Sequence, residues 1–420
     1  LKLGWAAGQA FKRDGHRNSV LIGKDTRLSG YMFESALEAG FVAAGVDVLL
    51  LGPLPTPGIA YLTRCFNADL GVVISASHNA YLDNGIKFFD GQGSKLNDET
   101  ELQIEAYLEE PSVTRHSSQL GSAKRIDSSR IRYQDFCKES IAGTSLEGLR
   151  IVLDCSNGAG YKVAPRILND LGAELIPIGC SPNGRNINHG CGSTSPELLQ
   201  RTVTAVQADL GIALDGDGDR LLMVDHEGRL IDGDQLIFIA AAARHRAGTL
   251  TGPVVGTVMS NLGLERGLES MGIEFMRAKV GDRYVLELLQ EHGGIIGGET
   301  SGHLICLDKT TTGDGIIAAL QILSEVVNSG KTLAELASEM TVFPQHMVNV
   351  RTADKIDLDA SAPIQQALKD AESSLGDRGR IVLRASGTEP VIRVMVEGEE
   401  EGKVVATATA LADVVRAAAA

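Results

Sequence analysis

Residues 209–225 read DLGIALDGDGDRLLMVD, an acidic loop held between two apolar runs. The apolar runs on either side are typical of buried strands. Asp215, Asp217 and Asp219 alternate along the loop, so an extended backbone turns all three carboxylates to one side. The two glycines between them let the backbone curl, which allows the three carboxylates to meet at one point.

This acidic loop predicts a magnesium site. Three carboxylates packed so closely repel one another unless a cation neutralises them, which leaves a solvated acidic turn as the weaker alternative. An EF-hand is excluded, because Arg220 stands where that loop needs glycine and His226 where it needs a bidentate glutamate. We expect one Mg²⁺ per chain, a cation that proteins usually share with a phosphate group.

Around this loop, the chain repeats a pattern of buried strand, helix and buried strand in three successive blocks, which begin near residues 19, 150 and 252. A polar stretch, residues 109–129, separates the first block from the second. The pattern then changes: helices near 359–375 and 400–418 flank short strands, which is typical of an α+β unit. The sequence predicts three consecutive α/β mixed-sheet domains plus a smaller C-terminal α+β domain, arranged around a central cleft. Their expected boundaries are 1–128 (domain I), 129–228 (domain II), 229–344 (domain III) and 345–420 (domain IV).

Composition narrows the class of protein. The 420 residues are 43% hydrophobic and 22% charged, no apolar run reaches the roughly 18 residues of a membrane span, and a net charge of −15 argues against a nucleic-acid surface. The chain starts at Leu1 rather than Met, and we expect residues to be missing upstream. The cysteines form no C-x-x-C pair, which favours reduced thiols in a cytoplasmic protein. They are Cys65, Cys137, Cys155, Cys180, Cys191 and Cys306.

Two further loops carry residue types that suit a sugar phosphate. Residues 384–390, RASGTEP, combine hydroxyls, a glycine-freed backbone and a guanidinium, which together suit a phosphate dianion; an ordinary turn between strands is the alternative. Residues 297–303, GGETSGH, end a strand with side chains that suit sugar hydroxyls. His303 could also transfer protons there, although a structural hydrogen bond is the commoner role for such a histidine.

The segment 73–80, VISASHNA, delivers serines into a loop after another apolar run. No G-x-S-x-G elbow surrounds them, so an acyl-transfer nucleophile is not indicated, whereas a phosphoryl carrier beside a metal remains open. Alone, the segment is typical of an Asn/Ser-rich turn. Residues 329–332, SGKT, end like a phosphate-binding P-loop, but the first glycine of that motif is absent and a helical pattern precedes them.

Taken together, the serine loop SASHNA, the metal loop DGDGDR, the sugar loop GGETSGH and the phosphate loop RASGTEP follow one another along the whole chain. In this order the chain resembles the α-D-phosphohexomutase superfamily, most closely its bacterial phosphoglucosamine mutase branch. The resemblance implies that Ser77 carries a phosphoryl group in the active enzyme. It also implies that Asp215, Asp217 and Asp219 bind Mg²⁺, with the phosphate on Ser77 supplying a further oxygen.

The resemblance assigns the other loops as well. Arg220 would lie beside the metal, and Glu299 and Ser301 would hold the sugar hydroxyls. Arg27, His78, Lys87, Lys279 and His303 would be the cationic or proton-transferring residues; at Arg27 and Lys279, helix caps with exposed charges are the alternative. The clamp on the non-reacting phosphate would be Arg384, Ser386, Gly387, Thr388 and Arg393.

The implied reaction interconverts glucosamine 6-phosphate and glucosamine 1-phosphate through a sugar 1,6-bisphosphate and feeds the synthesis of UDP-N-acetylglucosamine and cell-wall precursors. Small sugar phosphates are the expected partners, with activation by phosphorylation of Ser77 and a homodimer left open. The alternatives are a phosphomannomutase/phosphoglucomutase of the same superfamily, a haloacid-dehalogenase-type phosphatase that uses Asp215, and a non-enzymatic sugar-phosphate sensor. Two departures from the family pattern stand out: Ala80 replaces the usual proline, and the family's N-terminal F-G-T-D-G-x-R-G stretch is absent.

Overall fold

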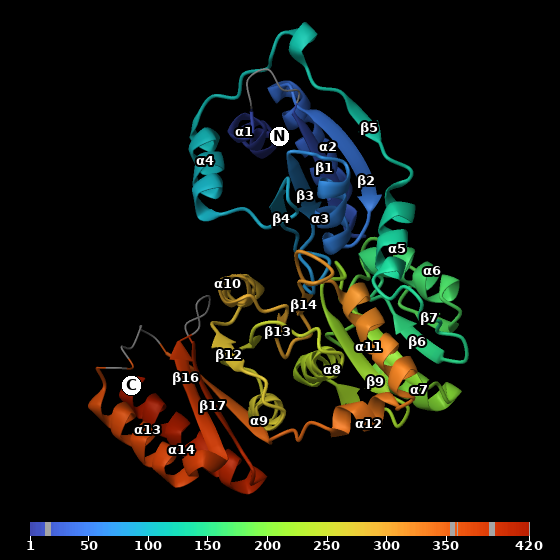
Figure 1. Cartoon of the computed structure of the whole chain (residues 1–420). Coiled ribbons are helices and arrows are strands. Elements are labelled where there is room, and N and C mark those ends of the chain that lie inside the picture. Colours follow the sequence, from blue (N-terminus) through green and yellow to red (C-terminus); the bar gives the residue numbers. More distant parts are fainter. Residues whose placement is uncertain (13–17, 353–357, 359, 386–390, 420) are drawn as a thin grey trace.

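The computed structural model describes residues 1–12, 18–352, 358, 360–385 and 391–419. Four sheets follow one another along the chain, each with its own helices (Figure 1). Three sheets are mixed and belong to α/β units, while the fourth is antiparallel and smaller. The predicted fold class is therefore confirmed, whereas the exact domain boundaries stay a prediction.

The first sheet has the strand order β4-β3-β1-β2-β5, with β4 antiparallel to β3. Residues alternate along its strands: Leu21 points into the core under α3, whereas Val20 and Ile22 pack with α1 and α2 on the other face. The elements are α1 (Lys2–Ala10), β1 (Ser19–Lys24), α2 (Leu28–Ala44), β2 (Asp47–Pro53), α3 (Thr56–Cys65), β3 (Leu70–Ile74), β4 (Ile86–Asp90), α4 (Asp98–Glu109), the single-turn helix η1 (Ser117–Gln119) and β5 (Ala123–Arg125).

The strand β5 lies inside the polar stretch 109–129, which the sequence shows only as a separator between blocks. It pairs in parallel with β2 from Ala123 to Arg125, at the edge of the first sheet. All three of its residues are exposed. An edge strand this short buries no apolar side chain, so no hydrophobic pattern marks it in the sequence.

The second sheet has the order β10-β9-β8-β6-β7 and the third has the order β12-β11-β13-β14. The elements of the unit around the second sheet are α5 (Ser129–Glu139), β6 (Arg150–Asp154), η2 (Ala159–Tyr161), α6 (Val163–Asp170), β7 (Glu174–Ile178), α7 (Glu197–Val206), β8 (Leu210–Leu214), β9 (Leu221–Asp225) and β10 (Leu230–Ile231). The elements of the unit around the third sheet are α8 (Gly233–Arg246), β11 (Val254–Thr257), α9 (Leu262–Ser270), β12 (Phe275–Ala278), α10 (Asp282–His292), β13 (Ile296–Gly298), β14 (Leu304–Cys306), α11 (Gly315–Ser329) and α12 (Leu333–Ser338).

The last sheet, β15-β17-β16, is covered by two helices (Figure 1). Its elements are β15 (Gln345–Arg351), α13 (Ala362–Leu375), η3 (Gly376–Arg378), β16 (Gly379–Ala385), β17 (Val391–Gly398) and α14 (Glu401–Ala419). The SGKT stretch follows the long helix α11 rather than a strand, which confirms that it is no P-loop. No helix in the described part of the chain is both long and apolar enough to cross a membrane.

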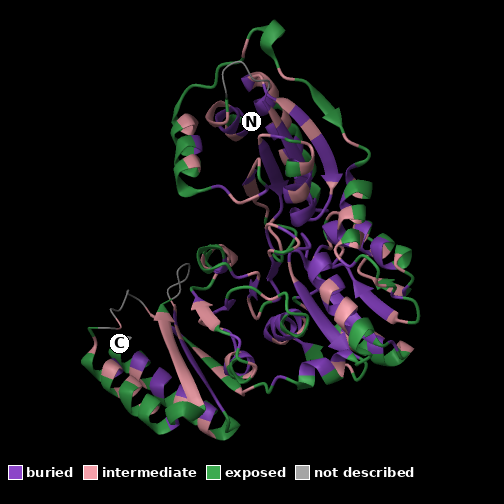
Figure 2. Cartoon of the chain, viewed as in Figure 1, coloured by how far each residue is buried: buried purple, intermediate pink, exposed green. Residues whose placement is uncertain are grey.

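Buried residues occur in all four domains (Figure 2). One hydrophobic cluster runs through the first three domains, from Leu21 to Met340, whereas domain IV has clusters of its own. Domain IV is joined to domain III by the buried Glu397 and by Arg380, which form an ion pair. Arg380 also donates to the main-chain carbonyls of Val258 and Ser260, both at 2.7 Å. The first three domains thus share a core, while domain IV is attached by a polar joint.

The turn at residues 258–261 of domain III, which Arg380 contacts, is also bonded by Asp234. Asp234 is fully buried near the start of α8. Its Oδ2 accepts hydrogen bonds from the Asn261 amide at 2.9 Å and the Thr300 hydroxyl at 2.7 Å. Burial, with the charge of Asp232 adding to it, raises the pKa of Asp234 from 3.8 to about 7. Asp234 therefore links the turn beneath domain IV to the loop 297–303.

We expect the folded chain to lose stability as pH rises from about 4 to about 7, because there the folded state holds the Asp234 proton more tightly than the unfolded state does. The gain in stability of Asp234→Asn over the original chain should therefore be larger at pH 8 than at pH 5. Urea midpoints at both pH values measure this difference. Asp127→Asn, at an exposed position beyond β5, should change neither midpoint, and parallel pH profiles for the Asp234 variant and the original chain would contradict the assignment.

Candidate active site

The serine loop begins where β3 ends. Ser75 is buried, and its hydroxyl donates to Asp25 Oδ2 at 2.7 Å. The same hydroxyl accepts the backbone N–H of Ser77 at 2.9 Å. Ser77 adopts a left-handed backbone with φ of +49°, a conformation that non-glycine residues rarely adopt. Ser75 is thus part of the scaffold, and Ser77 is the serine that the loop presents.

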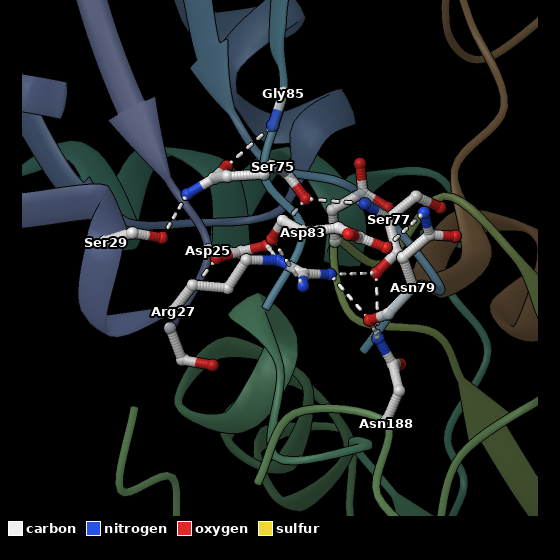
Figure 3. A network of polar contacts seen from close by, with 12 residues as sticks. Asp25, Arg27, Ser29, Ser75, Ser77, Asn79, Asp83, Gly85 and Asn188 are labelled. Carbon is white, nitrogen blue, oxygen red and sulfur yellow. Dashed lines mark hydrogen bonds and ion pairs between the residues drawn. The ribbon is translucent and has the colours of Figure 1, made fainter. Parts of the chain in front are cut away.

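A buried arginine beside this loop holds it in place (Figure 3). The Arg27 guanidinium donates to Asp25 Oδ2 at 2.7 Å. It also donates to four carbonyls of the loop: those of Ser77 at 2.9 Å, Asn79 at 2.9 Å, Asp83 at 3.0 Å and Ala80. With its donors engaged in this way, the buried Arg27 holds the serine loop in place and is not an exposed helix cap.

The aspartate loop follows β8 and approaches Ser77 from domain II. One oxygen from each of Asp215, Asp217 and Asp219 lies within 4.8 Å of the others, and all three residues are buried. The Ser77 hydroxyl donates to Asp215 Oδ2 at 2.6 Å. Burial, together with the charges of Asp219 and Asp217, raises the pKa of Asp215 well above its usual value.

The three aspartates fit a magnesium ion. They present only oxygen donors, which a hard cation prefers. Within the described residues, the Oδ1 atoms of Asp217 and Asp219 are buried and accept no hydrogen bond. Buried carboxylate oxygens of this kind carry a desolvation cost that a bound cation would offset.

Lys87, on β4, brings a positive charge to the same place. Its ammonium lies 2.8 Å from Asp217 Oδ2 and 3.5 Å from Asp219 Oδ2. Burial alone would lower the pKa of Lys87, but these carboxylates outweigh it and raise the pKa above its usual range. The Thr56 hydroxyl also donates to Asp217 Oδ2, at 2.6 Å. Lys87 therefore carries its positive charge beside the aspartates.

Two histidines flank the aspartates. His78 Nδ1 lies 3.4 Å from the Ser77 hydroxyl oxygen. His303 is buried, with Nδ1 3.8 Å from Asp219 Oδ1 and Nε2 3.3 Å from Asp282 Oδ2. Burial alone would lower the pKa of His303, yet the nearby carboxylates of Asp219 and Asp282 outweigh it and raise the pKa. His78 is thus the histidine near the serine, and His303 belongs to an ion cluster behind the metal loop.

The sugar loop and the Lys279 turn lie against each other in domain III. Glu299 Oε1 accepts the Gly281 N–H at 2.9 Å, and the Lys279 ammonium lies 5.7 Å from the centre of the Tyr284 ring. Ser301 is exposed. These contacts order the turn between β12 and α10 beside the sugar loop.

In domain IV, Arg384 and Arg393 face each other across β16 and β17. Burial and the charge of Arg393 lower the pKa of Arg384. Two guanidinium groups paired in this way favour an anion between them. The other predicted clamp residues, Ser386, Gly387 and Thr388, lie outside the described residues.

Comparison with known proteins places this geometry in a family. The chain matches the four phosphoglucomutase/phosphomannomutase domain families: alpha/beta/alpha domain I at residues 1–114, domain II at 132–228, domain III at 232–343 and the C-terminal domain at 347–414. The phosphoglucosamine mutase of Methylococcus capsulatus is 58% identical over 99% of this chain and 93% of its own length. That of Alkalilimnicola ehrlichii is 58% identical over 100% and 93%. The chain belongs to the phosphoglucosamine mutase family.

Solved structures agree on the fold. A phosphoglucomutase/phosphomannomutase family protein from Burkholderia thailandensis has a TM-score of 0.83 at 25% identity, covering 99% of this chain and 93% of that one. An Aspergillus fumigatus N-acetylphosphoglucosamine mutase, solved with GlcNAc-6P and magnesium, has a TM-score of 0.70 at 20% identity, covering 87% and 93%. Membership of the phosphoglucosamine mutase family does not favour the alternative of a phosphatase that uses Asp215. The family uses Mg²⁺ bound by three aspartates, and the three aspartates are present here.

The structure adds residues that the sequence reasoning missed. Asn188 donates to the Ser77 carbonyl at 2.8 Å and to the Asn79 carbonyl at 3.0 Å (Figure 3). Asp25 joins Ser75 to Arg27. Asp25 stands in the stretch GKDTR, where a carboxylate next to an arginine was a usable signal; Asn188 has no signal in the sequence, because its contact is formed only when domains I and II meet.

Magnesium should raise the melting temperature of this phosphoglucosamine mutase family member, because the aspartate site exists only in the folded state. At one hundred times its dissociation constant, a bound ion adds about 2.7 kcal/mol. Asp217→Asn should reduce the magnesium-induced shift, whereas Glu174→Gln, at an exposed position of β7, should leave it intact. Calorimetry with and without EDTA measures it, and an unchanged shift in Asp217→Asn would contradict the assignment.

Ala80 stands where the phosphoglucosamine mutase family usually has proline. Its φ is not positive, and within the described part of the chain its N–H donates no hydrogen bond. Ala80→Pro should therefore stabilise the chain by about 0.4–1 kcal/mol through the unfolded state and leave activity intact. Ala80→Gly should shift the urea midpoint the other way. A loss of activity in Ala80→Pro would show that the loop needs a backbone that proline cannot adopt.

Proposed function

We propose that this chain interconverts glucosamine 6-phosphate and glucosamine 1-phosphate through a phosphorylated Ser77. The observation that carries the proposal is the 2.6 Å contact between the Ser77 hydroxyl and Asp215, inside a cluster of three buried aspartates. A serine held there can carry a phosphoryl group beside a divalent cation.

The reaction consists of two phosphoryl transfers. In the first, the bond between Ser77 Oγ and phosphorus breaks, and phosphorus bonds to the free sugar hydroxyl of the substrate, whose proton leaves to a base. The product is glucosamine 1,6-bisphosphate. After the bisphosphate reverses its orientation, its other phosphate returns to Ser77, and the sugar oxygen that it leaves takes up a proton. The sugar monophosphate has then been isomerised, and Ser77 is phosphorylated again.

The chain's residues position this transfer and balance its charge. Lys87, beside Asp217 and Asp219, supplies a fixed positive charge, and Arg220 lies on the same loop. A bound Mg²⁺ would neutralise charge on the transferring phosphoryl group. His78 Nδ1 lies 3.4 Å from Ser77 Oγ, so His78 can exchange a proton with that oxygen or with a sugar hydroxyl placed beside it.

Binding of the other end of the substrate falls to domains III and IV. Glu299 and Ser301 hold sugar hydroxyls, with Lys279 beside them, and Arg384 and Arg393 clamp the non-reacting phosphate. The pairing of those two arginines across β16 and β17 supports the clamp.

The same proposal includes domain boundaries at 128/129, 228/229 and 344/345. It also includes a cytoplasmic location and activation by phosphorylation of Ser77, and it leaves a homodimer open.

The proposal is tested by locating the phosphate. After incubation with radiolabelled sugar bisphosphate, stable label should appear on Ser77, and Ser77→Ala should lower kcat by about 10³-fold or more. Ser118→Ala, at an exposed position of domain I, should retain label and activity. Label on Asp215 in place of Ser77 would instead support a phosphatase, and binding of glucosamine 6-phosphate without turnover by Ser77-phosphorylated protein would support a sensor.

Sugar preference needs a second measurement. The value of kcat/KM for glucosamine 6-phosphate should exceed the values for glucose 6-phosphate and mannose 6-phosphate. The reverse order would place the chain's activity with phosphoglucomutases or phosphomannomutases while leaving the role of Ser77 unchanged.

A further inference from the structure

Two cysteines of domain II come together at the carboxyl ends of neighbouring strands. Cys155 directly follows β6, and Cys180 lies just beyond β7, its parallel neighbour. The backbone N–H of Cys155 and the thiol of Cys180 donate to the same carbonyl, that of Ile178, each at 3.2 Å. Both side chains also pack on the same hydrophobic cluster. The two cysteines therefore follow closely on paired strands, and adjacent strands lie about 4.8 Å apart, which is within the Cα separations that a disulfide bridges.

The two thiols differ in access and in acidity. Cys180 is half-buried, and contact with the Cys155 thiol lowers the pKa of Cys180. Cys155 is fully buried, and contact with Cys180, followed by burial, raises the pKa of Cys155 well above its usual value. Because thiolates are the reactive form of cysteine, Cys180 is the thiol suited to react with an oxidant from solvent.

We propose that Cys155 and Cys180 form a reversible disulfide when the protein meets a peroxide, and that this bond switches the active site off. The bond itself needs only the two thiols and the oxidant, whereas its effect on activity rests on the proposed mutase function.

The chemistry proceeds in two steps. The Cys180 thiolate attacks one peroxide oxygen, the O–O bond breaks, and the second oxygen leaves as hydroxide, which takes up the proton lost by Cys180 to give water. The sulfur of Cys155 then attacks the sulfenic acid on Cys180, the S–O bond breaks, and the departing hydroxide takes the Cys155 proton as water. Overall, two thiols lose two electrons and two protons, and one peroxide becomes two waters.

The segment after Cys155 explains why this bond would reach the active site. The Ser156 carbonyl accepts the Asn188 N–H at 2.8 Å, and the Asn188 side chain donates to the Ser77 carbonyl at 2.8 Å. The Asn157 carbonyl accepts the Thr26 hydroxyl at 2.6 Å. A shift of this segment can therefore reach the serine loop by two routes, through Asn188 and through Thr26, which precedes the Arg27 that bonds the loop.

The segment also has little room to adjust. Ser156 and Asn157 both adopt left-handed backbones, with φ of +49° and +50°. A Cβ on Gly158 would lie 2.4 Å from the Gly216 carbonyl of the metal loop. Drawing the Cys155 sulfur to bonding distance of Cys180 is therefore expected to move a segment that touches the metal loop at Gly216 and reaches the serine loop through Asn188.

A third cysteine, Cys191, lies nearby but is differently engaged. Its sulfur accepts a hydrogen bond from the Asn157 side chain at 3.6 Å, and burial, with the charge of Asp154 adding to it, raises the pKa of Cys191 to about 11. It should stay reduced while Cys180 reacts.

The test treats the full chain with hydrogen peroxide and maps disulfides by mass spectrometry without reduction. A Cys155–Cys180 cross-linked peptide is expected. Activity should fall in step with it, by roughly 10- to 100-fold if the site shifts by about 1 Å, and dithiothreitol should restore both. Cys180→Ser should resist peroxide, whereas Cys65→Ser, at another half-buried thiol, should respond like the original chain.

Three outcomes would overturn the switch: a Cys180–Cys191 bond, oxidation of Cys180 without a cross-link, or equal inactivation of Cys180→Ser and the original chain. A Cys155–Cys180 bond that leaves activity unchanged would overturn the link to the active site. Because the cross-link is measured without any substrate, a chain that forms it but has no mutase activity before oxidation would refute the proposed function and not the disulfide.

Discussion

The close approach of two loops from different domains is the constraint on which the site depends. A Cβ on Gly216 would lie 2.5 Å from the Ser77 carbonyl, so only glycine lets the metal loop reach the serine. That approach allows the Ser77 hydroxyl to donate to Asp215. The hydrophobic cluster that runs through domains I to III holds the two loops in register, because close-packed interiors resist small displacements.

Positively charged side chains at the site attract an anionic substrate although the chain as a whole is negatively charged. The protein carries a formal charge of −15, yet its reaction requires a phosphorylated substrate to approach three aspartates. Lys87 reduces the repulsion in domain I, and the facing arginines Arg384 and Arg393 attract anions in domain IV. Short-range contacts in a partly desolvated site outweigh a diffuse charge that salt screens.

Much of the fold and of the metal site could be predicted from sequence, because local patterns encode them. The spacing of Asp215, Asp217 and Asp219 between two apolar strands predicted a cluster that the structure brings together. The smaller C-terminal α+β unit was also predicted, because the pattern of helices and strands changes there.

What could not be predicted depends on contacts between distant segments. The strand β5 adds three exposed residues to a sheet edge, so it has no apolar periodicity. Asn188 meets the serine loop only after domains I and II pack. The sequence left Arg27 as a helix cap or as a cationic or proton-transferring residue, and only its burial and its bonds to four carbonyls show that it organises the loop.

The joint of domain IV has a consequence for how the sequence can diverge. The Arg380 guanidinium donates a hydrogen bond to the main-chain carbonyl of Val258, and the Val258 N–H donates to the Ala278 carbonyl. Neither contact uses the valine side chain. Mutations can therefore change residue 258 over evolutionary time without loosening the joint, whereas the pair Arg380 and Glu397 must be kept or replaced together.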